Sequence, residues 1–130
     1  MREIKFRAWT KKSKRMCDVL GIDYCEEEIW LMPLDNALAR DFRCRLKNVE
    51  LMQYTGMEDK NRCEIYEGDV VKFISRLDSS KRMGTVGYWA GDAAFLIECE
   101  REIFYLFHDA LNREVIGNIY ENPEILRGAK

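Results

Sequence analysis

Two acidic side chains near the middle of the chain have the types and spacing for metal chemistry. Glu67 and Asp69 flank Gly68, and a pair of carboxylates can hold a divalent ion that activates water for hydrolysis. A structural interpretation explains the same residues: Gly68 makes a turn, and Asp69 fixes it by bonding to its own backbone. We favour the turn, because this bonding is a common role of Asp, and keep a metal-dependent hydrolase as a remote alternative.

Other catalytic signatures are weak or missing from the sequence. His108, the only histidine, stands next to Asp109 without a nucleophile motif, and sequence neighbours rarely face one another in a site. We therefore interpret His108 as a surface or capping residue. Neither a GxxxxGK[ST] nor a GxGxxG phosphate-binding motif occurs. The sequence predicts a protein without catalytic residues, and therefore not an enzyme.

The cysteines do not form a metal-binding pattern. They are odd in number, widely spread and without a CxxC pair, and a single histidine adds little to them. We expect reduced thiols that are buried or half-buried rather than a disulfide framework. We predict no metal and no cofactor. The five positions are Cys17, Cys25, Cys44, Cys63 and Cys99.

The N-terminal segment could bind nucleic acid. It holds seven Lys or Arg residues against one Glu over positions 1–15, and Trp9 adds a ring on which a base could stack. The whole chain opposes this, with a net charge of −2 and a pI near 5.6, so nucleic acid is the less favoured partner. In this alternative the contacts would come from Lys5, Arg7, Lys11, Lys12, Lys14 and Arg15.

Length and composition indicate one folded domain, or one domain with a small appendage. The chain has 130 residues, of which 47% are hydrophobic and 34% charged, enough to bury a core and remain soluble. No apolar run approaches the roughly 20 residues that span a bilayer, and charges interrupt any signal-peptide core. We therefore expect a cytoplasmic protein that does not bind a membrane.

Short strands dominate the first half of the predicted fold. Alternation predicts a half-buried strand at 3–9 and its hairpin partner at 16–22, with Gly21 as a bulge or as the exit from the strand. A strand is expected at 29–32, and one or two helical turns over 37–42, capped by Asp35 or Asn36.

The central stretch from Leu51 to Phe73 looks like a compact β unit. A strand at 49–54, a polar loop at 55–62 and a strong strand at 69–74 follow one another there.

Further strands are expected at 83–89, 94–98, 103–107 and 115–120. Glycines inside the first of these, at positions 84 and 87, suggest a bend or a close backbone approach. The run at 103–107, IFYLF, suggests a strand buried on both faces or a strand end over the core, followed by a helical turn at 108–112. A short helix begins after Asn122. About eight strands in all predict a small barrel or a curled antiparallel sheet.

The aromatic residues give one indication of a binding surface. Fifteen aromatics in a small β domain mostly form core, but Tyr88 and Trp89 are consecutive and must point to opposite faces of a regular strand. At least one of the two is therefore expected to be exposed or covered by a partner, which favours self-association or ligand stacking.

Three blocks of sequence resemble the YopX family of small phage and prophage proteins. They are REIKFRAW, LMQYTGMEDKNRCEIYEGDVVKF and EVIGNIYENPEIL, in that order, and they include the unusual words QYTG, IYEGD and GNIYENPE. The departures from the usual form are mild: Thr10 replaces an acidic residue, Arg62-Cys63 replaces Gly-Lys, and Ile125 replaces Leu.

The resemblance implies a mainly β protein with minor α content. It implies an N-terminal strand-rich extension over 1–48, and a small SH3-like β-barrel with a short C-terminal helix over 49–130. It also implies assembly into symmetric homo-oligomers, a phage or prophage origin, and action in the host cytoplasm. No catalytic residue is carried over from it.

The expected function is that of a non-enzymatic phage or prophage accessory protein that self-associates, with a host protein as a further partner. The residues singled out for binding or interaction are Arg7, Trp9, Gln53, Tyr54, Thr55, Tyr66, Glu67, Asp69 and Trp89.

Overall fold

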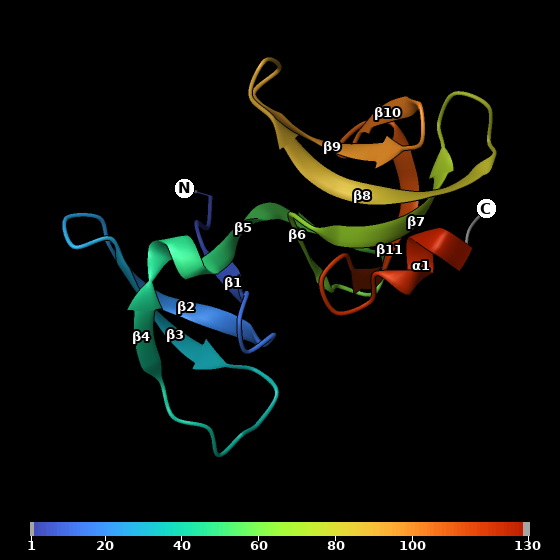
Figure 1. Cartoon of the computed structure of the whole chain (residues 1–130). Helices are drawn as coiled ribbons and strands as arrows, with labels where there is room; N and C mark the ends of the chain where they lie inside the picture. The colour runs from blue at the N-terminus through green and yellow to red at the C-terminus, as the bar shows by residue number, and fades with distance from the viewer. Residues whose placement is uncertain (1, 129–130) are drawn as a thin grey trace. The chain divides into compact units, whose positions relative to one another are not determined.

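The computed structural model of the protein describes residues 2–128, and these form a mainly β structure (Figure 1). The chain divides into two compact units, unit 1 (Glu3–Gln53) and unit 2, which begins at Tyr54. The division falls inside strand β5 (Val49–Glu58), whose first half pairs with β1 and whose second half pairs with β6. The predicted β class is confirmed. Among residues 2–128, no helix is long and apolar enough to span a membrane.

Unit 1 is an antiparallel sheet in the order β4-β3-β2-β1-β5. Its buried core comes from alternate positions of these strands, including Ala8, Ile29 and Leu31. The predicted hairpin is confirmed, and the register shift between Val19 and Gly21 is the expected bulge. The elements are β1 (Phe6–Thr10), β2 (Met16–Asp23), β3 (Glu28–Pro33), β4 (Phe42–Arg45) and the 3₁₀ turn η1 (Leu46–Asn48).

The helical turns predicted over 37–42 are wrong. The Asn36 Oδ1 atom accepts the backbone N–H of Leu38 at 2.9 Å, which makes a local turn in place of a helix. Leu38 is 91% exposed, so a helix here would have no apolar face to bury, and so short a helix is unstable without one. The chain instead continues into β4, a strand that we did not predict.

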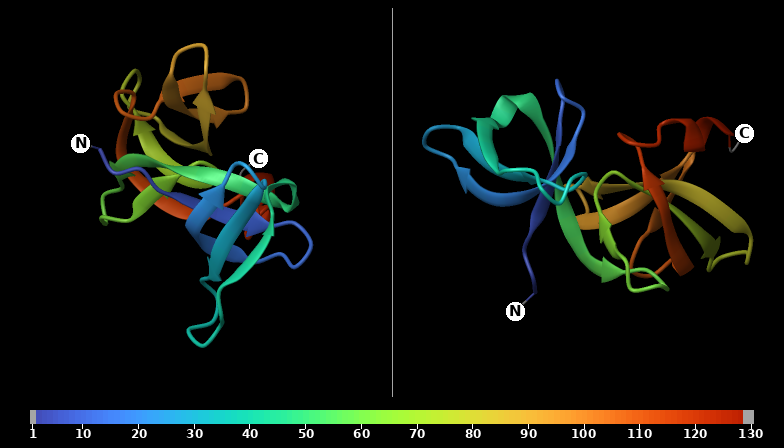
Figure 2. Two further views of the ribbon diagram at one scale, coloured as in Figure 1. Left: turned by 90° about the vertical axis from the view of Figure 1, so that its left-hand side faces the viewer. Right: turned by 90° about the horizontal axis from the view of Figure 1, so that it is seen from below.

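Unit 2 contains an antiparallel sheet in the order β10-β9-β8-β7-β11. The sheet curls strongly, as the long curved strand β8 shows (Figure 2). Its end strands, β10 and β11, do not pair with each other in the described part of the chain, so the sheet stays open. The elements are β6 (Glu64–Tyr66), β7 (Asp69–Ser75), β8 (Lys81–Trp89), β9 (Ala94–Cys99), β10 (Glu102–Tyr105), β11 (Ala110–Asn118) and α1 (Glu124–Gly128).

The core of unit 2 fixes which side chains are left outside. Val71 and Phe73 of β7, Val86 of β8, Ile97 of β9 and Phe104 of β10 form one buried cluster on the concave side. Because side chains alternate along a strand, the residues between them point to the opposite face. This outer face carries Lys72, Lys81, Met83, Thr85, Trp89, Ile103 and Tyr105.

Three predictions for unit 2 need correction. The sequence predicted a loop at 55–62, but strand β5 continues to Glu58. Gly56 adopts φ +85° and lies where the pairing of β5 with β6 shifts in register, between Tyr54 and Glu58. The run at 103–107 is not buried on both faces: Phe104 is buried, whereas Ile103 and Phe107 are exposed. Strand β11 begins at Ala110, where a helical turn was expected.

Candidate functional site

The turn at Glu67, Gly68 and Asp69 is structural. Asp69 is buried, and its Oδ2 atom accepts the backbone N–H of Tyr66 at 2.8 Å. Gly68 adopts φ +87°, a conformation that favours glycine. The favoured interpretation of this turn is therefore confirmed. Within residues 2–128, no three His, Cys, Asp or Glu side chains are placed to hold a metal ion.

Two of the sequence words that carry the family resemblance meet in space. Asp69 of IYEGD pairs with Asn118 of GNIYENPE, and the Ile119 N–H donates to the Gly68 carbonyl at 2.9 Å. Asn118 closes the following turn, since its Oδ1 atom accepts the backbone N–H groups of Tyr120 at 3.0 Å and Glu121 at 2.8 Å. These words therefore build the β7–β11 junction.

The remaining candidates of the central stretch serve the packing of β5 and β6. Tyr54 is buried, and its ring centroid lies 5.5 Å from that of Tyr66. The Thr55 Oγ1 atom donates to the Ile65 carbonyl at 2.7 Å. Glu67 is half-buried beside them. The structure thus brings Tyr54, Thr55, Tyr66, Glu67 and Asp69 into one region of unit 2.

Three candidates belong to unit 1 instead. Arg7 and Trp9 lie half-buried on β1, and Gln53 lies half-buried on β5 opposite Phe6. In this sheet β1 is an interior strand, because it lies between β2 and β5.

The basic N-terminal segment is partly neutralised by its own unit. Lys5 pairs with Glu3 at 3.5 Å, and Lys11 pairs with Glu50 at 3.6 Å. The Arg15 guanidinium donates to both carboxylate oxygens of Asp35, at 3.0 and 2.8 Å, and this contact lowers the pKa of Asp35. Lys12 and Lys14 are exposed and form no ion pair with a described residue.

His108 is exposed, and its Nδ1 atom lies 2.8 Å from Asp109 Oδ1. Asp109 serves the chain turn, because its other carboxylate oxygen accepts the backbone N–H of Tyr105 at 3.0 Å. The hydrogen bond with His108, followed by that with Tyr105, lowers the pKa of Asp109. This pair has the surface and capping role that we expected.

The thiols match the expectation in part. None of the five cysteines, all of which the structure describes, is in a disulfide. Cys17 and Cys99 are buried, and burial raises the pKa of each thiol to about 11. Cys44 is half-buried, whereas Cys25 and Cys63 are exposed, contrary to the prediction.

Four apolar side chains on β8, on β10 and in the turn after β10 are exposed in unit 2. Trp89 is 48% exposed, Ile103 45%, Tyr105 38% and Phe107 64%. The first three lie on the outer face of the sheet, and Phe107 packs beside Tyr105 with ring centroids 5.8 Å apart. We call these four residues the aromatic face. Tyr88, on the other side of β8, is also exposed, so the prediction for the Tyr88-Trp89 pair is confirmed.

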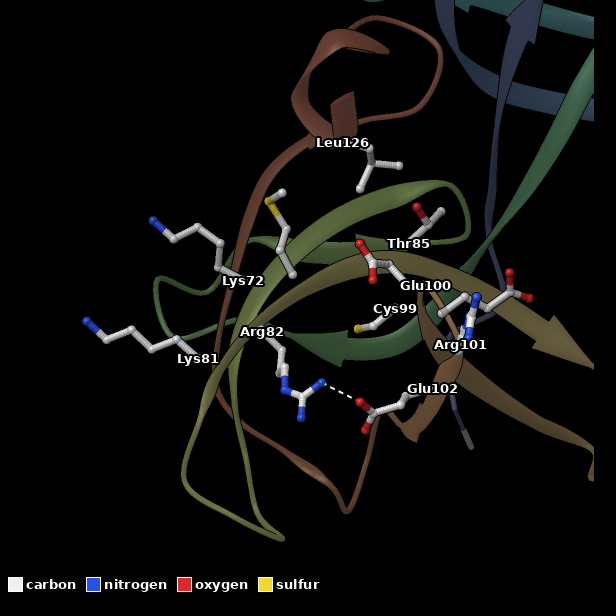
Figure 3. Close-up of a pocket in the computed structure, with 11 residues that line it drawn as sticks. Lys72, Lys81, Arg82, Thr85, Cys99, Glu100, Arg101, Glu102 and Leu126 are labelled. Carbon is white, nitrogen blue, oxygen red and sulfur yellow. Dashed lines mark hydrogen bonds and ion pairs between the residues drawn. The ribbon is translucent and has the colours of Figure 1, made fainter. Parts of the chain in front are cut away.

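A groove of about 860 Å³ continues this outer face toward the start of β8 (Figure 3). Lys72 of β7 and Lys81 of β8 lie at one side of the groove and extend in the same direction, and neither forms an ion pair with a described residue. The neighbouring Arg82 is neutralised, with Nη1 2.6 Å from Glu102 and Nη2 3.3 Å from Asp78.

This lysine pair was missed from the sequence. Lys72 pairs with Met83, and Ile74 pairs with Lys81, so the two lysines share a face only through the β7–β8 register. The two lysines are nine positions apart along the chain, and no local sequence pattern indicates the β7–β8 register. A smaller hollow of about 290 Å³ borders the same two lysines and Arg82.

These features define a mainly β protein with two antiparallel sheets and an apolar and cationic outer face on unit 2. The family of YopX proteins matches residues 5–127, nearly the whole chain, and the protein belongs to this family.

Two solved structures share the fold. The crystal structure of protein EF1440 from Enterococcus faecalis is 24% identical, with a TM-score of 0.61 over 97% of this chain and 99% of that one. The crystal structure of protein yopX from Bacillus subtilis is 21% identical, with a TM-score of 0.61 over 100% of both chains. None of the curated proteins compared with the chain matches it.

Proposed function

We propose that the protein is a non-enzymatic binding protein, of phage or prophage origin and active in the host cytoplasm, that self-associates through the aromatic face. The observation that carries the proposal is the exposure of Trp89, Ile103 and Tyr105 on one face of the sheet, with Phe107 packed against Tyr105. Exposed large apolar side chains gathered in one place are typical of interaction sites, and Trp and Tyr are the residues that most often dominate binding energy.

The edge of the sheet supports face-to-face packing over strand addition. Strand β10 ends the sheet, and such an edge can recruit another strand through its unpaired backbone groups. Here Asp109 accepts the Tyr105 N–H, and the Tyr105 carbonyl accepts the Asp109 N–H at 2.9 Å. With this edge position occupied, a second copy gains more by covering the exposed rings. A face that meets its own copy gives a closed, symmetric dimer.

The strand order supports an SH3-like character for unit 2. In the order β10-β9-β8-β7-β11 a four-strand meander is followed by a last strand that returns beside the first. We infer that the family's SH3-like barrel corresponds to this curled, partly open sheet, with unit 1 as the N-terminal extension.

Replacing Trp89 and Phe107 with serine should abolish self-association. Each apolar side chain buried in an interface contributes roughly 1.5–3 kcal/mol, so the double variant should dissociate at least a hundredfold more readily. Sedimentation velocity over a concentration series measures this. Leu77→Ser is the matched control, because Leu77 is 80% exposed but lies outside the aromatic face.

A wild type that stays monomeric at all concentrations would contradict the proposal. A host protein retained by the wild type and lost by the Trp89→Ser/Phe107→Ser variant would then assign the aromatic face to that partner. Equal assembly of the wild type and the double variant would place the contact elsewhere.

Nucleic-acid binding through the N-terminal segment is the alternative function. Its support is the pair Lys12 and Lys14, since Lys5, Lys11 and Arg15 already contact carboxylates. Such binding would weaken steeply as salt rises. An absence of binding to single- and double-stranded oligonucleotides at low salt would remove this alternative.

A further inference from the structure

Lys72 and Lys81 lie at one side of the groove on adjacent antiparallel strands, both exposed, and no ion pair to either is formed within residues 2–128. Like charges on neighbouring strands repel one another, and Glu114, which lies opposite Lys72 on β11, contacts Lys60 at 3.6 Å. The groove is lined by the apolar Met83 and Leu126 and by charged side chains, which are Arg82, Glu98, Glu100, Arg101 and Glu102. The lysine side of the groove therefore suits a ligand that carries two anionic groups next to an apolar one.

Unit 1 presents such a group at the β2–β3 turn. Tyr24 is 74% exposed, and Glu26 and Glu27 are exposed beside it. Neither glutamate carboxylate forms an ion pair with any residue that the structure describes. The turn thus combines an aromatic ring with two carboxylates that form no ion pair with a described residue, which matches the lysine side of the groove.

The backbone of this turn is held in one conformation. The Asp23 Oδ1 atom accepts the N–H groups of Cys25 at 3.0 Å and Glu26 at 3.1 Å. The Glu27 carbonyl accepts the Leu46 N–H at 2.8 Å, and Arg45 donates to the Glu26 carbonyl at 3.1 Å. Arg45 thus contacts the backbone carbonyl of Glu26, and it forms no ion pair with the Glu26 or Glu27 carboxylate. A fixed turn loses less conformational entropy on binding than a flexible loop.

We propose that the groove of one copy receives the β2–β3 turn of a second copy, with Glu26 and Glu27 against Lys72 and Lys81. Tyr24 packs over Met83 and Leu126. The inference rests on the proposed self-association and adds a second, head-to-tail contact to it. A contact between two different surfaces continues from copy to copy and closes into a ring or extends into a chain. Its charged part weakens as salt rises.

Two charge-reversal variants test this contact. In Lys72→Glu/Lys81→Glu the groove repels the turn, and in Glu26→Lys/Glu27→Lys the turn repels the groove. Each variant alone should self-associate at least tenfold more weakly than the wild type in sedimentation velocity. Lys12→Glu/Lys14→Glu is the control for the lysine variant, because it makes the same change of net charge on unit 1, and it should assemble like the wild type.

Mixing the two variants gives the decisive measurement. Each variant then offers the other a matching surface, so an equimolar mixture should recover the wild-type affinity of self-association, which neither variant reaches alone. Such a rescue identifies a contact between copies, since a contact within one chain gains nothing from mixing. Circular dichroism confirms that both variants are folded.

Three results would overturn the inference. The variants could assemble like the wild type, or the mixture could fail to recover the assembly. Saturable binding of inorganic phosphate that depends on Lys72 and Lys81, without rescue on mixing, would assign the groove to a small anion. A monomeric wild type would remove the proposed function as well, whereas a wild type that assembles beside unaffected variants removes only this contact.

Discussion

Gly84→Ala is expected to lower the free energy of unfolding of unit 2 by about 2–3 kcal/mol. Gly84 is buried in β8 between β7 and β9. A Cβ atom there would lie 2.4 Å from the Glu98 carbonyl oxygen and 2.7 Å from Cys99 Sγ. The carbonyl belongs to a paired strand and has little room to move, so the sheet must distort. Urea denaturation followed by tryptophan fluorescence measures the loss.

Gly87→Ala is the matched control on the same strand. A Cβ atom at this position meets nothing within 4 Å, and alanine restricts the unfolded chain more than glycine does. We expect no loss, or a gain of roughly 0.5 kcal/mol. Equal destabilisation by the two substitutions would show that the close approach of Gly84 to β9 does not exist, and would contradict the β8–β9 register that produces it.

Asp59→Ala should destabilise unit 2 by about 3 kcal/mol, since three backbone N–H groups lose their acceptor. Asp59 Oδ1 accepts from Asn61 at 2.8 Å and Cys63 at 2.9 Å, and Oδ2 accepts from Val115 at 2.9 Å. The side chain is 8% exposed. It therefore joins the β5–β6 loop to β11. Asp18→Ala, at an exposed aspartate whose side chain has one hydrogen bond within residues 2–128, from its neighbour Val19, should change stability little.

The contribution of Asp59 should depend on pH. Burial raises the pKa of this carboxyl, but the three backbone N–H groups outweigh burial and hold the pKa below its ordinary value. The folded protein therefore binds the proton less tightly than the unfolded chain, whose Asp pKa is about 3.9. The stabilisation is fully present above that value and is lost as pH falls through the folded pKa.

Unfolding titrations of the wild type and Asp59→Asn over a pH series measure this dependence. The difference between the two proteins should be largest near neutral pH and should narrow in acid. A difference that stays constant down to strongly acidic pH would contradict the assigned role of the ionised carboxylate.

Local chemistry made much of the fold predictable. The Gly68-Asp69 turn, the Gly21 bulge and the strand at 69–74 each follow from residues close together in sequence. The prediction failed where burial decides: the segment at 37–42 has the spacing of a helix, but Leu38 has nothing to pack against.

The candidate site depended more on long-range pairing. Trp89 was identified because its neighbour Tyr88 had to take the opposite face. The lysine pair required the β7–β8 register, and the bond from Asp59 to Val115 spans 56 residues. The words IYEGD and GNIYENPE identify the family, and they do so through residues that hold β7 to β11.

The central claim is that the exposed aromatic residues of unit 2 become buried when copies of the protein assemble. Oxidative footprinting of wild type at low and high concentration tests it most directly, because the reaction rate of a side chain follows its exposure to solvent. The account predicts that Trp89, Tyr105 and Phe107 become protected in the concentrated sample, while Leu77 keeps its rate. Unchanged rates at all three aromatic residues, in a sample that sedimentation shows to be assembled, would contradict it.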